Sequence, residues 1–243
     1  MDQQNFKKFI ITSRSDFAIY LRFLIIGTYR SLKKYNLYVE QLGEKIQELD
    51  LENKPKTPID SEIYEEFNDK IQRVSNKLLN LFGDLQSDSL SYYKFRKQLV
   101  KRNIEVKKDL GELSELIWKN LSRANEARNW GLHEPESLLN AHFENIEKLW
   151  TREEFERYKT EFTTVNIANF NKYEGSWLIS LHRECENNQR LYNELYNSML
   201  SDYTLLIGTS PEIKEVDYHT RPLDIELMIP KTSFLMQQKK YKK

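Results

Sequence analysis

A polar segment near the middle of the chain, EARNWGLHEPESLL at residues 126–139, contains side-chain types that suit chemistry on phosphate. Arg128 carries a permanent positive charge and a fork of donors that matches phosphate oxygens. Asn129 follows it directly and offers an amide. His133 comes four residues later, and a histidine side chain exchanges protons near neutral pH. Together the three types offer a cation, an orienting amide and an acid–base group, which suits chemistry on phosphate.

The same residues also fit a structural explanation, in which they cap and pack a junction between two helices. An arginine followed by a histidine at this spacing is common by chance, and the adjoining asparagine makes the pattern more specific. Glu126 and Glu134 flank the motif and either orient His133 or complement a neighbouring positive charge. On an unbroken helix, Arg128 and His133 would point in different directions. A break between them is therefore a condition for a shared site.

Composition predicts an all-α fold. The chain of 243 residues has only 7 Gly and 6 Pro, and 30% of its residues are charged. Apolar residues recur at helical spacing in several long stretches. We expect an antiparallel bundle of about five to six helices, covering about residues 15–51, 61–85, 90–130, 135–149, a short helix after Thr151, and 177–206. Gly111 lies inside the third stretch and is not expected to break it.

The predicted helices place the motif at a junction. Gly131 and Pro135 indicate that one helix ends and another begins there, because proline is favoured at the first position of a helix. One helical-bundle domain is expected over residues 1–208. Residues 209–243 form an irregular C-terminal segment, in which 223–229 alternate like a short strand or an extended segment and 237–243 make a basic tail.

The segment RNWGLH resembles the Arg-(Asn/His/Asp)-x3–5-His signature of the HEPN superfamily, whose members are helical bundles. The resemblance implies a metal-independent endoribonuclease of a prokaryotic defence or toxin–antitoxin type. Arg128, Asn129 and His133 would be its catalytic residues, acting on RNA to leave a 2′,3′-cyclic phosphate. It also implies a homodimer in which two motifs line one cleft, and a neutralising or sensor protein as a partner. No cofactor is implied.

Two alternatives stay open. The chain is either an inactive HEPN-like module that binds nucleotide, RNA or a second copy, or a structural helical domain for protein interaction. The second alternative predicts that Arg128 and His133 lie far apart or form separate hydrogen bonds.

A second candidate segment, SYYKFRKQLVKR at residues 91–102, interleaves aromatic and basic side chains. Such a face can bind RNA, with bases stacked on Tyr92 or Tyr93. A solvated amphipathic helix face is the alternative. The RNA-binding hypothesis concerns the following residues: Tyr92, Tyr93, Lys94, Arg96, Lys97, Lys101 and Arg102.

Charge and cysteine content exclude several classes. Lys+Arg and Asp+Glu balance at 37 each, so nucleic-acid binding has to come from a local patch. Cys185 is alone, and His182, Cys185 and Glu186 are too few to hold a structural zinc, so we expect no disulfide and no metal. The most apolar run, residues 17–27, is too short to cross a bilayer and contains Arg22. We expect a cytoplasmic protein that does not enter the membrane.

Overall fold

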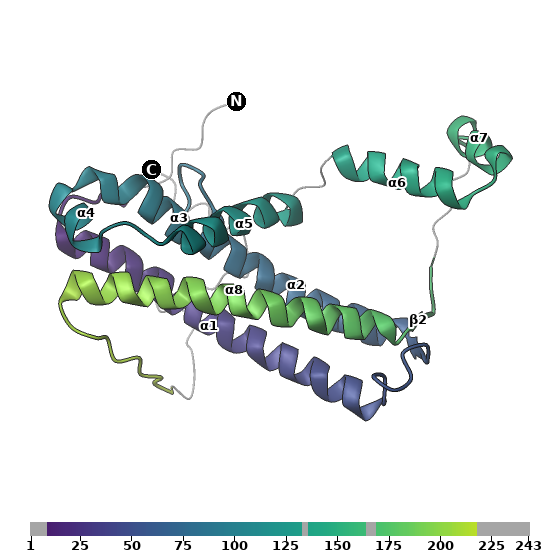
Figure 1. Ribbon diagram of the computed structural model, residues 1–243, viewed down its shortest axis with the longest axis horizontal. Coiled ribbons are helices and arrows are strands. Elements are labelled where there is room, and N and C mark those ends of the chain that lie inside the picture. The colour runs from purple at the N-terminus through teal and green to yellow at the C-terminus, as the bar shows by residue number, and fades with distance from the viewer. Residues whose placement is uncertain (1–8, 133–135, 164–168, 218–243) are drawn as a thin grey trace, which may run out of the picture.

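The protein is an all-α helical bundle with one minor two-stranded sheet (Figure 1). The computed structural model describes residues 9–132, 136–163 and 169–217. Its elements in chain order are α1 (Arg14–Glu48), β1 (Pro58–Asp60), α2 (Ser61–Gly83), α3 (Tyr92–Lys94), the π-helix η1 (Phe95–Leu99), the 3₁₀ turn η2 (Val100–Arg102), α4 (Ile104–Leu110), α5 (Glu115–Leu132), α6 (Glu136–Leu149), α7 (Arg152–Thr160), β2 (Lys172–Glu174) and α8 (Ser176–Ile207).

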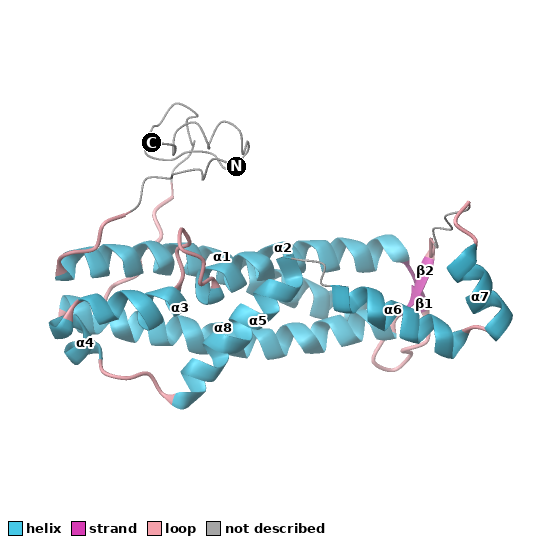
Figure 2. Cartoon of the chain, turned by 90° about the horizontal axis from the view of Figure 1, so that it is seen from above, coloured by secondary structure: helices cyan, strands magenta, loops and turns pink. Residues whose placement is uncertain are grey.

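Three long helices, α1, α2 and α8, form the centre of the bundle, and α5 packs against α2 and α8. The start of α1 meets the end of α8, where Arg14 Nε donates to the carbonyl oxygen of Leu206 at 2.8 Å. At the opposite end, β1 pairs antiparallel with β2 (Figure 2). The boundaries of α1, α2, α6 and α8 agree closely with those expected from apolar spacing. The strand pair was not predicted, since each strand has only three residues.

Local sequence fixes where the long helices begin and end. Ser13 caps α1, and Asp16 completes a capping box with it, so α1 begins slightly before the position expected from the sequence. The backbone and hydroxyl hydrogen bonds to Asp16 lower the pKa of its carboxyl to about 2. The capping box of Thr151 and Glu154 predicted for the short helix α7 is confirmed. Gly208, with φ of 77°, ends α8 in the left-handed region that glycine adopts without strain.

Buried aromatic residues tie the three central helices together. The rings of Tyr35 on α1 and Tyr192 on α8 meet edge to face with centroids 5.3 Å apart. Phe82 on α2 stacks on Tyr192 with centroids at 6.0 Å. The hydroxyls are satisfied as well: Tyr35 donates to the carbonyl oxygen of Cys185, and Tyr192 shares a hydrogen bond with Ser75. Burial of such large apolar side chains stabilises the bundle by about 2 kcal/mol each.

The single helix expected over residues 90–130 was wrong. The structure divides this stretch into α3, η1, η2, α4 and α5. Gly111 has φ of 60°, which ends α4, and the chain leaves helical geometry before α5 begins at Glu115. The apolar spacing hid this break because α4 and α5 both contribute their apolar residues to the same core.

Helices α6 and α7 form a hairpin that projects from the bundle beyond the end of α5 (Figure 1). Aromatic contacts hold the hairpin together, with Phe143 against Tyr158 at 5.9 Å and Trp150 against Tyr158 at 5.4 Å between centroids. Leu138 and Leu139 on α6 remain about half exposed. The helix expected at residues 135–149 as a member of the bundle therefore packs on α7 in this hairpin.

The C-terminal segment is irregular as far as the structure describes it, at residues 209–217. The alternating stretch 223–229 and the basic tail lie outside the described residues. Within the described ranges, every helix is too short or too polar to cross a membrane.

Candidate functional site

Arg128 lies at the contact between the last turns of α5 and the end of α2, and it is buried. Its guanidinium makes three hydrogen bonds. Nε donates to Asn80 Oδ1 at 3.1 Å, Nη2 to Asp84 Oδ2 at 3.2 Å, and Nη1 to Asn129 Oδ1 at 3.1 Å. The Arg128–Asp84 ion pair is almost withdrawn from solvent, with side-chain exposures of 9% and 11%. A charge pair so enclosed is weakly screened by salt.

Asp84 connects Arg128 to the loop that follows α2. Its carboxylate also accepts the backbone N–H of Gln86 at 2.9 Å, and its carbonyl oxygen accepts the hydroxyl of Ser91. Ser91 in turn caps α3 and exchanges backbone hydrogen bonds with the hydroxyl of Tyr20. Burial raises the pKa of Tyr20 to about 12, and the negative charge of Asp84 adds to this effect. The motif and the aromatic–basic segment are therefore linked through a few buried groups.

The other residues of the motif differ in exposure. Asn129 is exposed, and because its Oδ1 accepts from Arg128, its Nδ2 is left to donate outward. Glu126 is exposed and accepts the hydroxyl of Ser122 at 3.3 Å. His133 and Glu134 lie outside the described residues. α5 ends at Leu132 and α6 begins at Glu136, so two separate helices flank His133 in the sequence.

A hollow of about 400 Å³ lies beside α5, between α2 and α8. Its α5 side includes Arg123, Trp130 and Gly131, and its α8 side includes Glu184 and Asn188. Polar, apolar and aromatic side chains all line the hollow, and one of them, Trp130, is 56% exposed. Gly131 approaches α2 closely, since a Cβ there would lie 3.1 Å from Asn76 Oδ1. This contact with Asn76 favours glycine at position 131 whether or not the motif is catalytic.

The aromatic–basic face expected at residues 91–102 has to be corrected. Tyr92 is fully buried, so its ring cannot stack on a base; it stacks on Phe95 and donates its hydroxyl to Asp202 Oδ2 at 2.7 Å. Arg96 is buried too, with Nε 3.4 Å from Asp202 Oδ2. Burial raises the pKa of Asp202 to about 6, against the opposing charge of Arg96. The sequence pattern gave a wrong prediction of exposure because the polar groups of Tyr92 and Arg96 are paired with Asp202 inside the core.

Tyr93 and Lys94 are also withdrawn from solvent. The Tyr93 ring lies 6.1 Å from that of Trp118, and Tyr93 is only 9% exposed. Lys94 Nζ donates to the carbonyl oxygens of Ser87 and Ser89 and so holds the loop after α2. Of the seven residues considered for RNA binding, Lys97, Lys101 and Arg102 remain exposed.

A small basic hollow of about 250 Å³ joins part of this exposed set to residues that the sequence did not single out. Lys97 and Lys101 line it together with Lys107 of α4 and Trp118 of α5. Lys97 Nζ also lies 4.8 Å from the centre of the Tyr93 ring. Glu112 also lines the hollow, so its three lysines outnumber one acid there. Three ammonium groups beside an indole suit a phosphate with an adjoining base. Lys107 and Trp118 escaped the sequence analysis because the break at Gly111 brings them to this face.

No three His, Cys, Asp or Glu side chains gather into a metal-binding group in the part of the chain that the structure describes. Comparison with models of protein families, with curated proteins and with solved structures gives no match for this chain.

Proposed function

We propose that the protein is a HEPN-like, metal-independent endoribonuclease that uses Arg128, Asn129 and His133. The observation that supports this is a guanidinium fixed by three hydrogen bonds beside an exposed amide, at the helix end that leads into His133. Such a cation needs no reorganisation to meet a developing negative charge.

The proposed reaction is an internal attack on phosphorus. A base removes the proton of the RNA 2′-hydroxyl, and the 2′-oxygen bonds to phosphorus. The bond to the 5′-oxygen breaks, and that oxygen takes up a proton, which leaves a 2′,3′-cyclic phosphate. His133 exchanges these protons, alone or with the same residue of a second copy. Arg128 has five N–H donors, of which three have partners among the described residues. We propose that the second N–H of Nη1 and that of Nη2 donate to phosphate oxygens.

The basic hollow of Lys97, Lys101 and Lys107 supports RNA as the substrate class. The chain as a whole has no net charge, so a local cluster of cations has to provide the attraction to a polyanion. Trp118 on the wall of this hollow offers a surface for an unpaired base.

The first prediction tests catalysis. Purified protein is expected to cleave a mixed pool of single-stranded and structured RNA in EDTA, leaving cyclic phosphate ends. His133→Ala is expected to slow cleavage at least about 100-fold, as removal of a general acid or base does. His142→Ala is the matched control, because His142 is exposed on α6, where its Nε2 lies 3.4 Å from the hydroxyl of Tyr158. Equal loss in both variants, or cleavage that needs a divalent ion, would contradict the mechanism.

The second prediction tests the basic hollow. Changing Lys97, Lys101 and Lys107 together to Gln is expected to weaken RNA binding and to lower the dependence of log K on log [salt] by about 2, or roughly 0.7 per lost contact on single strands. The measurement is a titration of fluorescent RNA at several salt concentrations. A triple change of exposed lysines elsewhere, at Lys34, Lys54 and Lys56, is the control. An unchanged salt slope in the first variant would exclude this surface.

A second candidate, an inactive HEPN-like binding module, is supported by the Arg128–Asp84 ion pair. Asp84 neutralises the guanidinium inside the protein, and this is what a structural arginine requires. This candidate predicts that wild type binds RNA or nucleotide with an affinity that His133→Ala leaves unchanged, and that neither protein cleaves.

A further inference from the structure

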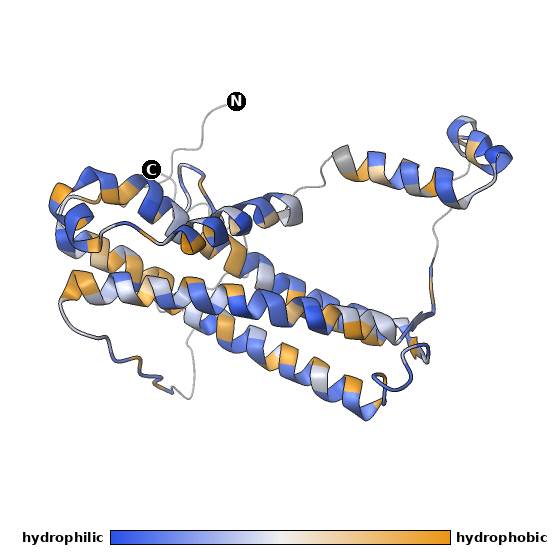
Figure 3. Ribbon diagram, in the orientation of Figure 1, coloured by the Kyte–Doolittle hydropathy of each residue, from blue (hydrophilic) through white to orange (hydrophobic). Residues whose placement is uncertain are grey.

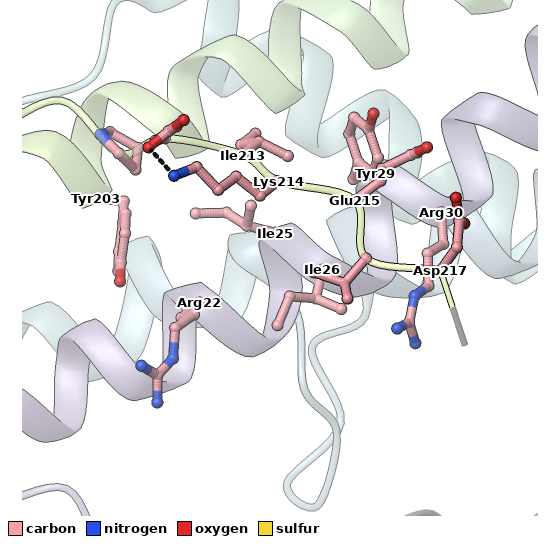
Figure 4. A pocket seen from close by; sticks show the side chains of 13 residues that line it. Arg22, Ile25, Ile26, Tyr29, Arg30, Tyr203, Ile213, Lys214, Glu215 and Asp217 are labelled. Carbon is pink, nitrogen blue, oxygen red and sulfur yellow. Dashed lines mark ion pairs between the residues drawn. The ribbon is translucent and has the colours of Figure 1, made fainter. Parts of the chain in front are cut away.

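A hollow of about 550 Å³ lies between the N-terminal half of α1 and the segment that follows α8 (Figure 4). Ile25 and Ile26 of α1 face Ile213 of the segment across it, and Tyr29 and Tyr203 form its aromatic walls. The three isoleucines lie near its middle, beside Lys214, which forms an ion pair with Glu212. Arg22 and Arg30 lie toward its two ends.

The segment 209–217 is held along α1. Lys33 Nζ lies 2.7 Å from a carboxylate oxygen of Glu215. Hydrogen bonds from Lys33 and Tyr29 lower the pKa of the Glu215 carboxyl, so the carboxylate is the form that holds this end of the segment in place. Since α8 ends beside Arg14 and Glu215 meets Lys33, the segment runs beside α1 in the direction of that helix. Its last described residue, Asp217, lines the hollow.

The adjoining face of α1 carries apolar side chains without a cover. Ile19, Phe23 and Ile26 follow helical spacing and are 43%, 58% and 46% exposed. Figure 3 shows the concentration of hydrophobic residues on this half of α1. Within the described residues, Arg22 and Arg30 beside this stripe have neither an ion-pair nor a hydrogen-bond partner. The face therefore suits a ligand that is apolar along its length and carries acidic groups.

We propose that residues 223–229 of the same chain, LDIELMI, dock on this face of α1. The segment alternates Leu223, Ile225 and Leu227 with two acids, Asp224 and Glu226. In extended form its aliphatic side chains share one face and meet the apolar stripe, while the acids lie along its edges within reach of the arginines. Charge and hydrophobicity are thus complementary to what α1 presents.

The length of the chain permits this contact. The face from Ile19 to Arg30 covers eleven helical steps, about 17 Å at 1.5 Å per residue. Residues 218–222 span up to about 17 Å when extended. Asp217 lines the hollow, so the docking segment can begin at any point of the stripe. A tethered segment is also present at high effective concentration, which favours it over a free peptide.

A second copy of the chain fits this face less well. A two-fold pairing of the α1 stripes would bring Arg22 and Arg30 toward the same arginines of the other chain, and like charges at close range oppose association. The segment 223–229 instead carries two acids, Asp224 and Glu226, which would add to Glu212, Glu215 and Asp217 among the residues that line the hollow.

The test is the reactivity of a thiol introduced by Ile26→Cys in the full chain. The native Cys185 is buried, and burial raises the pKa of its thiol to about 11, so it does not compete for the reagent. Glu40→Cys is the control, exposed on the same helix about 21 Å further along. Docking is expected to slow alkylation at position 26 at least about tenfold relative to position 40, because the site must first open.

Variants of the docking segment distinguish this contact from other causes of protection. Ile225→Asp with Leu227→Asp is expected to restore fast alkylation at position 26 and to leave position 40 unchanged. Arg22→Glu with Arg30→Glu is also expected to make alkylation at position 26 fast. Adding Asp224→Arg with Glu226→Arg to this variant reverses both sets of charges and is expected to slow alkylation at position 26 again. Equal rates at positions 26 and 40 in the chain with its native C-terminal segment would overturn the proposal. Protection that increases with protein concentration would overturn it in favour of a second copy.

Discussion

Replacement of Arg128 by alanine is expected to lower the free energy of unfolding by about 3–5 kcal/mol, the range observed when one partner of a buried ion pair is removed. Most of this loss in stability comes from the partners of Arg128 that remain in the variant. Asp84 remains buried without its charge partner, and Asn80 loses the donor that satisfies its side-chain oxygen. Unfolding in urea, followed by circular dichroism, measures the change.

Two controls make this prediction specific. Arg157→Ala removes an exposed arginine, 4.0 Å from Glu161, and is expected to cost no more than about 1 kcal/mol. In a double-mutant cycle with Asp84→Ala, the two losses should be far from additive, because each change removes the same interaction. A loss at Arg128 as small as that at Arg157 would show that the guanidinium is not enclosed as described.

The stability of the Arg128 cluster decides which variants can report on catalysis. Loss of activity in Arg128→Ala would follow from unfolding as well as from chemistry. Asn129→Ala is more informative, since Asn129 is exposed and its removal takes from Arg128 only one of three acceptors. His133→Ala and Asn129→Ala together therefore test the motif without dismantling the contact between α2 and α5.

The long helices could be predicted because their signals are local. The apolar spacing of α1, α2 and α8 repeats over many turns, and the capping box at Thr151 needs only four residues. Gly111 shows where this approach fails. Its sequence context permits a helix, and the apolar residues of α4 and α5 belong to one core, so the spacing does not reveal the positive φ of Gly111 that separates the two helices.

The partners of the candidate site could not be predicted from spacing. Asn80 and Asp84 lie far from Arg128 in the sequence, and nothing local marks Asp84 as the acceptor of a buried guanidinium. The prediction of an exposed basic face at residues 91–102 was wrong for a related reason. Tyr92 and Arg96 look like an exposed face until Asp202, at the end of α8, is seen to bind both. Whether a polar side chain is buried thus depends on a partner that is distant in the sequence and becomes a neighbour only in the folded structure.

The contact between α2 and α5 also depends on Gly83, the last residue of α2. A Cβ at this position would lie 2.6 Å from the backbone nitrogen of Asn125 and 2.7 Å from the backbone carbon of Ala124. Backbone atoms cannot move aside as a flexible side chain can. The carbonyl oxygen of Gly83 also accepts a hydrogen bond from the side-chain Nδ2 of Asn125 at 2.7 Å, which joins the end of α2 to α5 at the same point.

Gly83→Ala is therefore expected to destabilise the protein by about 3 kcal/mol, at the upper end of the usual cost of overpacking. Gly27→Ala is the matched control. A Cβ at Gly27 meets only the methyl groups of Leu81 at 3.4 and 3.5 Å, and alanine favours a helix interior by about 1 kcal/mol. We expect that variant to be neutral or more stable in the same urea titration.

The two glycine variants also test whether the helix contact holds the candidate site together. Forcing α5 away from α2 at Gly83 should weaken the Arg128–Asp84 pair one helical turn further along α5. The coupling energy between these two residues is then expected to fall in the Gly83→Ala background and to stay unchanged in the Gly27→Ala background. If the coupling survived in both, the ion pair would be independent of the helix contact, and the position of Arg128 would have to be set by Asp84 and Asn80 alone.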